Sequence, residues 1–431
     1  MSINNNVRQP ARTRDVLIVS YSFPPLNNIS ARRFGEMAPY MEEFGWRTWV
    51  ITTNSSGPLS VRLNQSQIFR IGKDLQEATY LDHKKILAQM SRRLRILRGF
   101  LRRHNVWFYS VDSTLKWYKQ VVSEYANIRK VLPKVDAVVG SYGPPAVLWL
   151  ARYFSRRYRV PWIADFRDLG ALRPDARNTL AKSLDCAIER LLLKSAKMIT
   201  TVSPTLSRIF AEVYRKPTLV IYNGWDCVHR TGDRQIPITE RTSFKQPYLY
   251  YAGRFYEHRM KGFFVLFEVM ARKPDLKLLI RSLGPLELEE QVRAKVAALG
   301  IRDRVDILPP CDAEQMHFEE ERALANLIVE DIDEDDIFSR GTLTGKLLQL
   351  VASSPPVLAI ARRDSDIRDV LKITEKGQLC SSSAEVHNFV EKLQNESKIF
   401  SGNPDKIAQF SKKRQAEKFC HILNQIIADI K

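Results

Sequence analysis

Short apolar runs alternate with segments of helical periodicity along most of this 431-residue chain. A parallel sheet covered on both faces needs such runs, and each crossover between its strands needs a connection long enough for a helix. The first series of runs predicts strands at 15–20, 49–52, 136–141, 161–168, 197–202 and 218–221. A second series predicts strands at 248–251, 276–280, 304–307, 326–329, 356–359 and 377–380, with helices that include 30–44, 146–158, 286–299 and 345–352. The pattern therefore predicts an α/β protein with parallel sheets.

The two series of strands define two domains. A chain of this length is too long for one ordinary core, and two domains of roughly 200 residues each are the expected division. We place the first domain at 1–226 and the second at 247–404. Residues 227–246 are polar and irregular, as expected of an interdomain linker. The final segment, 405–431, has a helical pattern and is basic, and we expect it to pack back toward the first domain.

The formal net charge of +19 indicates an anionic partner. The candidate partners are nucleic acid, an anionic membrane surface and phosphorylated substrates. No run approaches the roughly eighteen apolar residues of a membrane span, and the polar stretch 1–14 lacks a signal-peptide core, so we expect neither an integral nor a secreted protein. The five cysteines are widely separated, which indicates neither a disulfide framework nor a zinc knuckle and fits a reducing cytoplasm.

The stretch 248–270 reads as strand, polar loop and helix. The apolar run breaks at Gly253, and the loop then presents Arg254, Arg259 and Lys261. In an open α/β sheet such a loop lies at the carboxyl end of a strand, where ligands bind, and fixed cations there suit a phosphate group. The alternative is an ordinary connection between strand and helix whose charges are solvated.

Two further groups of polar residues follow predicted strands. The loop after 15–20 has no G-x-G-x-x-G, but Asn28 and Ser30 offer polar groups at a helix start, where an anion is favoured; alternatively, Ser30 is only the N-cap. Asp165, Arg167 and Asp168 stand at the end of the strand 161–168. They form a candidate catalytic constellation, or else a structural ion pair at the strand end.

Residues 84–103 predict a basic amphipathic helix. Eight Lys and Arg residues and no acid surround one apolar face. That face consists of Leu87, Met90, Leu94, Leu97 and Leu101. Such a helix suits an anionic headgroup layer, although it could instead pack on its own domain with a solvated basic side. Nucleic acid is disfavoured because no recognition motif accompanies the charge.

Several short motifs, in their order along the chain, resemble the retaining glycosyltransferases of family four. They are Val19-Ser-Tyr-Ser-Phe-Pro-Pro-Leu-Asn-Asn, Glu43-Phe-Gly-Trp, Ala164-Asp-Phe-Arg-Asp, Val202-Ser-Pro, Tyr222-Asn-Gly, Ala252-Gly-Arg with Lys261-Gly, and Thr344-Gly-Lys-Leu-Leu-Gln before Pro355-Pro. The resemblance covers nearly the whole chain. It implies the GT-B fold, in which two Rossmann-like domains face each other across a central cleft.

The resemblance also implies residues for donor binding. Arg254 and Lys261 match the pair that holds the donor pyrophosphate, with one extra residue between them here. Gly345 and Lys346 would bring backbone amides and a cation to the same phosphates. Gln349 stands where a Glu usually contacts the ribose hydroxyls. A second Glu, expected near residue 341, is absent, although the acid-rich run 330–336 precedes that position.

The family pattern further implies catalysis without a metal cofactor. Asp331-Ile-Asp imitates a metal-binding D-x-D, but this fold holds the leaving phosphate with Arg and Lys. Asp165 or Asp168 could orient the acceptor hydroxyl. Arg167 ends the strand where many relatives carry a His near the reacting sugar, and an Arg cannot act as a base.

The resemblance implies transfer of a sugar, with retention, from a UDP- or GDP-sugar to a lipid-linked or cell-envelope saccharide. We expect the enzyme to lie on the cytoplasmic side, peripherally on the inner leaflet, and to bind no nucleic acid. An inactive GT-B scaffold that binds a nucleotide sugar is one alternative, suggested by Gln349 and the absent Glu. A GT-B epimerase or phosphate-dependent transferase is another.

The basic segment generates a prediction about membrane binding. Each cation near an anionic surface contributes about 1 kcal/mol, so the chain should sediment with anionic but not neutral liposomes, and salt should weaken the binding. Changing Arg92, Arg93, Arg95 and Arg98 to Glu should release it, since the repulsion would also keep Leu94 and Leu97 out of the headgroup layer. Indifference of the folded wild-type chain to anionic liposomes at low salt would contradict this expectation.

Overall fold

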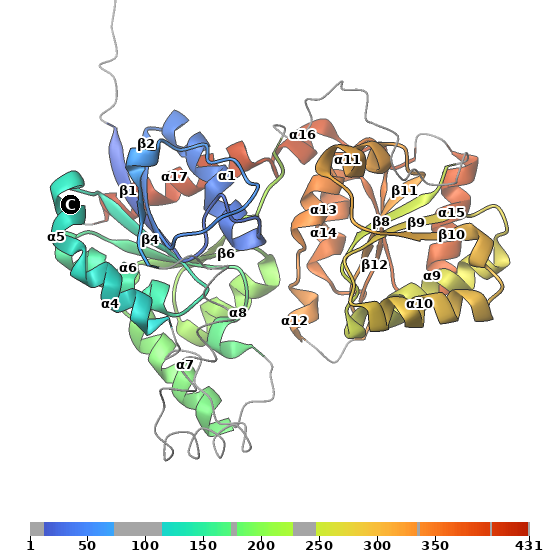
Figure 1. Cartoon of the computed structure of the whole chain (residues 1–431), viewed down its shortest axis with the longest axis horizontal. Coiled ribbons are helices and arrows are strands. Elements are labelled where there is room, and N and C mark those ends of the chain that lie inside the picture. Colours follow the sequence, from blue (N-terminus) through green and yellow to red (C-terminus); the bar gives the residue numbers. More distant parts are fainter. Residues whose placement is uncertain are drawn as a thin grey trace, which may run out of the picture. The chain divides into compact units, whose positions relative to one another are not determined.

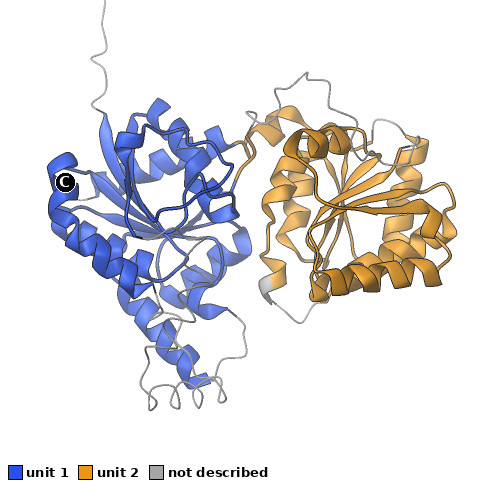
Figure 2. Cartoon of the chain, in the orientation of Figure 1, with its two compact units in different colours: residues 1–223, 412–431 blue, residues 224–411 orange. Residues whose placement is uncertain are grey.

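The computed structural model describes residues 13–72, 114–173, 179–226, 247–333, 337–396 and 399–429. The chain divides into two compact units, unit 1 with residues 1–223 and 412–431 and unit 2 with residues 224–411 (Figure 2). The chain therefore enters unit 2 close to the predicted domain end at 226 and returns to unit 1 at 412. The predicted tail, 405–431, is divided between the units. The predicted linker 227–246 and the basic segment 84–103, with its proposed membrane contacts, lie outside the described residues.

Unit 1 is built on a seven-stranded sheet with the strand order β3-β2-β1-β4-β5-β6-β7 (Figure 1). All neighbouring strands are parallel. The strands are β1 (Arg14–Ser20), β2 (Trp46–Thr52), β3 (Ile68–Arg70), β4 (Ala137–Ser141), β5 (Trp162–Phe166), β6 (Met198–Thr201) and β7 (Thr218–Val220). The sequence predicted every strand except β3, whose three residues are too few to show a periodic pattern.

Helices connect these strands and cover the sheet. The α-helices of unit 1 are α1 (Ile29–Glu43), α4 (Leu115–Ser123), α5 (Tyr125–Val131), α6 (Ala146–Tyr158), α7 (Thr179–Leu193), α8 (Pro204–Tyr214) and α17 (Lys412–Ala428), with 3-10 helices η1 (Gln65–Gln67) and η2 (Gly170–Leu172). Helix α1 begins one residue earlier than predicted. Its N-cap is Asn28, whose side chain accepts a hydrogen bond from the Ala31 amide at 2.8 Å, and not Ser30, which lies inside the first turn.

Helix α17 packs against α1 although the two helices come from opposite ends of the chain. The Phe34 and Phe419 rings meet edge to face, with centroids 5.5 Å apart. Lys412 Nζ lies 2.6 Å from Glu36 Oε2, and both side chains are buried. Apolar residues of the two helices share one core with β1, β2 and β4. The carboxyl-terminal helix is therefore an integral layer of unit 1.

Unit 2 contains a six-stranded parallel sheet with the order β10-β9-β8-β11-β12-β13. Its strands are β8 (Leu249–Gly253), β9 (Leu278–Ser282), β10 (Val305–Leu308), β11 (Ala325–Val329), β12 (Val357–Ile360) and β13 (Gly377–Cys380). All six were predicted. The central strands β8, β11 and β12 are mostly apolar and fully buried, as expected for a sheet that helices cover on both faces.

The helices of unit 2 alternate with its strands. They are α9 (Met260–Arg272), α10 (Leu286–Ala298), α11 (Ala313–Glu321), α12 (Ile337–Arg340), α13 (Gly345–Leu350), α14 (Asp366–Thr374), α15 (Ser383–Asn395) and α16 (Pro404–Ala408), with 3-10 helices η4 (Glu257–Arg259) and η5 (Arg302–Arg304). The main core lies between the sheet and α9, α10 and α15. A smaller apolar cluster on strands β8 and β9 includes Tyr250 and Leu279, with Met316 of α11 packed against it.

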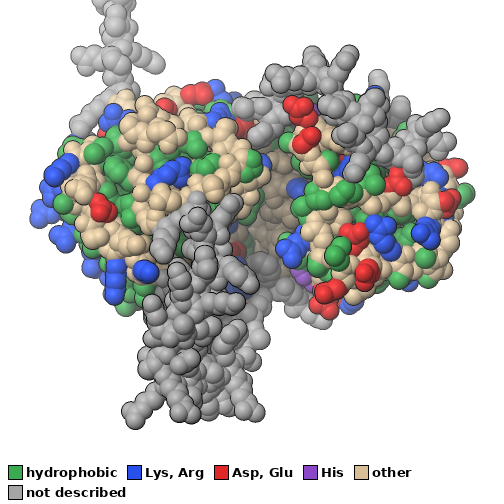
Figure 3. All heavy atoms as spheres, viewed as in Figure 1, with side chains coloured by type: hydrophobic (Ala, Val, Ile, Leu, Met, Phe, Trp, Pro, Cys, Tyr) green, Lys and Arg blue, Asp and Glu red, His purple; other side chains and the backbone are tan. Residues whose placement is uncertain are grey.

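Positive charge is visible at the surface of unit 1. In Figure 3, Lys and Arg atoms gather along the left edge of this unit, where α4 and α5 lie in Figure 1. These two helices carry exposed Lys116, Lys119, Arg129 and Lys130. Among the helices that the structure describes, none is long and apolar enough to cross a membrane.

Candidate active site

The carboxyl ends of β8 and β11 mark the place in unit 2 where the strand order reverses. Strands β9 and β10 lie on one side of β8, whereas β11, β12 and β13 lie on the other. In open parallel sheets, ligands bind at such a point. Strand β8 ends at Gly253, and Glu330 directly follows β11. The polar residues around these two strand ends form the candidate active site.

Arg259 and Glu330 form an ion pair at this place. Arg259 Nη2 lies 2.9 Å from Glu330 Oε2, and the two side chains are only 16% and 5% exposed. The Arg259 guanidinium also lies 4.5 Å from the centre of the Tyr256 ring. Burial raises the pKa of Glu330 to about 7, while Arg259 opposes this shift and Asp331 adds to it. Arg259 is thus a cation whose position is set by a carboxylate and an aromatic ring.

Two buried oxygens of this region are available for hydrogen bonding. Within the described part of the chain, Glu330 Oε1 and Thr344 Oγ1 are buried and have no hydrogen-bond partner. Thr344 immediately precedes α13 and does not cap it with its side chain. Because buried polar groups are normally paired, each oxygen is suited to a ligand hydroxyl or a water molecule.

Lys346, in the first turn of α13, approaches the end of β8. A Cβ atom placed on Gly253 would lie 3.2 Å from Lys346 Nζ and 2.9 Å from the Tyr251 hydroxyl. Burial lowers the pKa of Lys346 to about 8; Glu320 opposes the shift and Arg259 adds to it. The absence of a side chain at Gly253 leaves room for this ammonium group beside the strand end.

The glycine of the Lys261-Gly262 pair has a packing role. A Cβ atom at Gly262 would lie 2.8 Å from Val329 Cγ1 and 3.2 Å from the Glu330 carbonyl oxygen. Helix α9 therefore needs a glycine here to approach the end of β11 closely. This packing holds η4, and with it Arg259, next to Glu330.

The other predicted donor-site residues are more exposed. Arg254 is exposed, with its guanidinium 6.0 Å from the Tyr256 ring centre. Lys261 is 63% exposed, and its Nζ lies 2.5 Å from Asp333 Oδ2. Gln349 is exposed, and Gly345 begins the six-residue helix α13. The structure thus brings Gly253 and Lys346 together and places Arg254 near Tyr256.

From the sequence, Arg259 is one of three loop cations that suit a phosphate group but has no specific role, and Glu330 is one member of an acidic run. One signal was available for Glu330. It is the first residue after the strand predicted at 326–329, and strand ends meet at one edge of a parallel sheet. Its pairing with Arg259 could not be deduced, because nothing local in the sequence sets which cation faces which acid.

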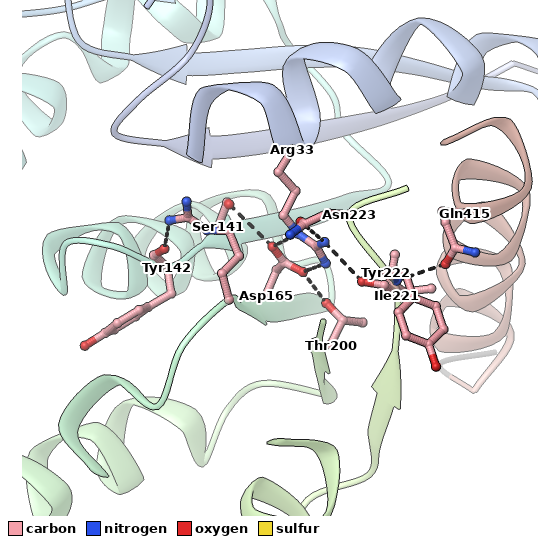
Figure 4. Close-up of polar contacts among 10 residues, drawn as sticks. Arg33, Ser141, Tyr142, Asp165, Thr200, Ile221, Tyr222, Asn223 and Gln415 are labelled. Atoms are coloured by element: carbon pink, nitrogen blue, oxygen red, sulfur yellow. Dashed lines mark hydrogen bonds and ion pairs between the residues drawn. The ribbon is translucent and has the colours of Figure 1, made fainter. Parts of the chain in front are cut away.

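In unit 1, Asp165 lies at the centre of a buried polar cluster (Figure 4). Its two carboxylate oxygens accept hydrogen bonds from Arg33 Nε at 2.7 Å and Arg33 Nη2 at 2.5 Å. Thr200 of β6 donates a further bond at 2.8 Å, and Ser141 of β4 donates one at 3.4 Å. The Arg33 and Asp165 side chains are 1% and 0% exposed.

The same arginine connects two of the sequence motifs. Arg33 Nη1 donates to the Ile221 carbonyl and to Asn223 Oδ1, each at 3.1 Å. The Asp-Phe-Arg-Asp and Tyr-Asn-Gly motifs thus contribute Asp165 and Asn223 to one guanidinium, and Gln415 of α17 accepts a bond from the Tyr222 amide (Figure 4). This geometry favours the structural alternative for Asp165 over a role in orienting a substrate.

Arg167 and Asp168 lie beyond this cluster. Arg167 donates to the Tyr142 carbonyl. Asp168 is 33% exposed, forms an ion pair with Arg173 at 2.8 Å, and accepts a bond from the Gly170 amide. The nearby Glu189 of α7 is buried, which raises its pKa to about 7 even though it accepts hydrogen bonds from Tyr214 and the Ala171 amide. Solvent thus reaches Asp168 and Arg167, which are both half-buried, but not Asp165.

The remaining predicted positions belong to α1 and to the acidic run. The Asn28 side chain is occupied as a helix cap, and Ser30 is half-buried in the first turn. Asp331 accepts a bond from the Asp333 amide at 3.0 Å, and Asp333 pairs with Lys261. The described residues contain no group of three or more His, Cys, Asp or Glu side chains placed to hold a metal ion. Metal independence stays a prediction.

Comparisons with known proteins agree with this architecture. Residues 30–224 match the model of the glycosyl transferase 4-like domain. No curated protein matches the chain significantly.

Among solved structures, sucrose-phosphate synthase from Thermosynechococcus elongatus aligns over 96% of this chain and 100% of its own, with a TM-score of 0.63 and 13% identity. The lipopolysaccharide outer core galactosyltransferase WaaB aligns over 97% and 100%, with a TM-score of 0.57 and 13% identity. HepE of Anabaena, in complex with UDP and glucose, aligns over 97% and 99%, with a TM-score of 0.54 and 14% identity. The predicted GT-B fold, with two Rossmann-like domains, is confirmed.

The buried cluster of unit 1 yields a prediction about stability. Asp165→Asn should lower the free energy of unfolding by about 3–5 kcal/mol, because it leaves the Arg33 guanidinium buried without its counter-charge. The matched control is Asp168→Asn, which breaks a partly exposed pair and should change stability by about 1 kcal/mol or less. Urea unfolding followed by circular dichroism measures both. Equal small losses in the two variants would contradict the structural assignment of Asp165.

Proposed function

We propose, on the premise of a glycosyl transferase 4-like domain at residues 30–224 and a GT-B fold, that this chain is a retaining glycosyltransferase. It transfers a sugar from a nucleotide-sugar donor, UDP- or GDP-linked, to a saccharide acceptor. Unit 2 binds the donor, and unit 1 binds the acceptor. The observation that carries the proposal is the group of Arg259, Glu330 and Lys346 at the carboxyl ends of β8 and β11.

The two cations of this group suit the donor pyrophosphate. The Lys346 ammonium is largely withdrawn from water, and Arg259 is held by Glu330 and Tyr256. Charges fixed in a poorly solvated site interact with a phosphate far more strongly than charges in water, and they need no reorganisation during the reaction. Arg254 and Lys261 add two exposed cations from the same loop.

Glu330 suits the sugar of the donor. One carboxylate oxygen is engaged by Arg259, and the other is buried without a partner in the described part of the chain. A sugar hydroxyl donates readily to such an oxygen, and Thr344 Oγ1 can serve a second hydroxyl. Glu330 thereby supplies a hydroxyl-binding carboxylate in a chain that has glycine at 341 and glutamine at 349.

The chemistry follows from the placement of charge. The bond between the anomeric carbon and the donor phosphate breaks, and its electron pair leaves with the nucleotide. The acceptor hydroxyl oxygen forms the new bond on the same face of the sugar, and its proton passes to the departing phosphate oxygen. Arg259 and Lys346 stabilise the negative charge that grows on this phosphate. No protein base and no metal ion are required, and the acceptor is a lipid-linked or cell-envelope saccharide reached at the inner leaflet.

A panel of UDP- and GDP-sugars tests the function. Release of nucleotide from at least one donor, accelerated by a saccharide acceptor and unchanged by EDTA, is the expected result; retention is read from the anomeric configuration of the product. Arg254→Ala and Lys261→Ala should each lower turnover by about a hundredfold, the scale for one charge-stabilising group. Arg272→Ala, on the same helix as Lys261 and also exposed, is the control and should leave turnover unchanged.

The panel also separates the alternatives. Conversion of the donor sugar without nucleotide release would identify an epimerase. Binding of a donor without turnover would identify an inactive scaffold. Full activity in both Arg254→Ala and Lys261→Ala would remove these residues from the site.

The pKa of Lys346 predicts how donor binding depends on pH. Below about pH 8 the side chain is protonated and attracts the pyrophosphate, whereas above that value it becomes neutral. The Kd for UDP or GDP should therefore rise with pH above about 8, by up to about tenfold per pH unit. Lys346→Arg keeps its charge throughout this range and should show no such rise. Titration calorimetry measures both, and a flat wild-type profile would exclude Lys346 from the phosphate site.

A further inference from the structure

Helix α7 of unit 1 carries an apolar stripe on its outer surface. Leu180, Leu184 and Leu191 are 69%, 44% and 57% exposed, and Ala187 between them is also exposed. The spacings of four, three and four residues place all four side chains along one face of the helix. In Figure 1, α7 extends away from the sheet at the lower side of unit 1. We call this set of four residues the α7 stripe.

The α7 stripe is not the face that α7 turns toward its own unit. That opposite face buries Ala181, Leu192 and the two acids of the helix, Asp185 and Glu189. Glu189 accepts hydrogen bonds from Tyr214 of α8 and from the Ala171 amide, which fixes the rotation of α7 about its axis. The helix thus has one apolar side inside unit 1 and a second apolar side outside.

The charges at the surface of α7 all have one sign. Arg190 and Lys194 are exposed beside the α7 stripe, whereas Asp185 and Glu189 are 0% and 3% exposed. An exposed apolar stripe on a helix whose own exposed charges, among the described residues, are cations matches an anionic lipid surface, where the leucines enter the boundary between headgroups and acyl chains and the cations meet phosphate groups. The exposed cations of α4 and α5 give unit 1 further attraction to such a surface.

We propose that the α7 stripe is a membrane-contacting surface that binds anionic phospholipid headgroups and inserts leucine side chains between them. The proposal concerns unit 1 alone and does not depend on donor chemistry. If a lipid-linked acceptor is used, as proposed above, the same contact holds the enzyme beside it.

The test compares sedimentation of the full chain with vesicles of phosphatidylcholine alone and of phosphatidylcholine mixed with phosphatidylglycerol. The wild-type chain should bind only the mixed vesicles. Leu184→Gln with Leu191→Gln should weaken this binding by about tenfold or more, since burying even one leucine changes a partition constant by that factor. The glutamines remove apolar surface without adding charge, and Leu184→Glu with Leu191→Glu should abolish binding.

The matched control is Leu286→Gln with Ile373→Gln, which alters two exposed apolar residues on helices of unit 2, 73% and 39% exposed. This control should bind vesicles like wild type. All variants should keep the wild-type melting temperature and any donor hydrolysis found in the panel. Vesicle binding is measured without turnover, so the vesicle result can be interpreted even if the transferase proposal fails.

Three outcomes would overturn the proposal. The first is absence of wild-type binding to mixed vesicles at low salt. The second is equal binding by wild type and the Leu184→Gln, Leu191→Gln variant, which would assign the membrane contact to other residues. The third is a lowered melting temperature in that variant with vesicle binding retained, which would show that the α7 stripe is covered by part of the chain itself.

Discussion

The ion pair between Arg33 and Asp165 is the interaction on which unit 1 depends most. Both side chains are buried, so each charge is tolerated only because the other faces it through two hydrogen bonds. Arg33 comes from α1, Asp165 from β5, and the bonds of Arg33 to Ile221 and Asn223 add the segment after β7. The pair therefore fixes a helix and two distant parts of the sheet in one arrangement. Unit 2 contains a similar pair, because Arg281 of β9 holds Glu319 of α11 at 2.5 and 2.9 Å.

The candidate donor site also contains a largely buried ion pair, but this pair has a different role. Arg259 and Glu330 also form a largely buried pair, but one oxygen of Glu330 is left without a partner in the described part of the chain. Burial that raises the pKa of Glu330 to about 7 lowers that of Lys346 to about 8, because both charged forms lose water. A pair with complete bonding serves folding, whereas a site with unused bonding capacity and a poorly hydrated cation is suited to a charged, hydroxyl-rich ligand.

The short motifs of the sequence fall into these two classes, fully bonded structural residues and residues that shape the candidate ligand site. Asp165 and Asn223 are joined to one buried guanidinium and hold unit 1 together. Gly253 and Gly262 permit close approaches at the ends of β8 and β11, and Lys346 lies against the first of them. Motifs that looked alike as candidate site residues thus divide into those that stabilise the sheet and those that shape the ligand site. The α7 stripe belongs to neither group, because its leucines are 44–69% exposed at the surface of unit 1.

The sequence by itself determined the order and type of nearly all the strands and the two-domain division, and it predicted a ligand site at one edge of the unit 2 sheet. These follow from apolar periodicity and from the rule that parallel strands end at one edge, both of which are visible locally. Strand β3 was missed because three residues show no period. Only the tertiary structure decided which charges meet. Arg33 and Asp165 are 132 residues apart, and no local pattern encodes such a pairing, because it depends on how helices pack across a folded sheet. The same reason explains why Asp165 was a candidate for catalysis from its sequence while its surroundings give it a structural role, and why the sequence alone did not select Glu330 as the partner of Arg259.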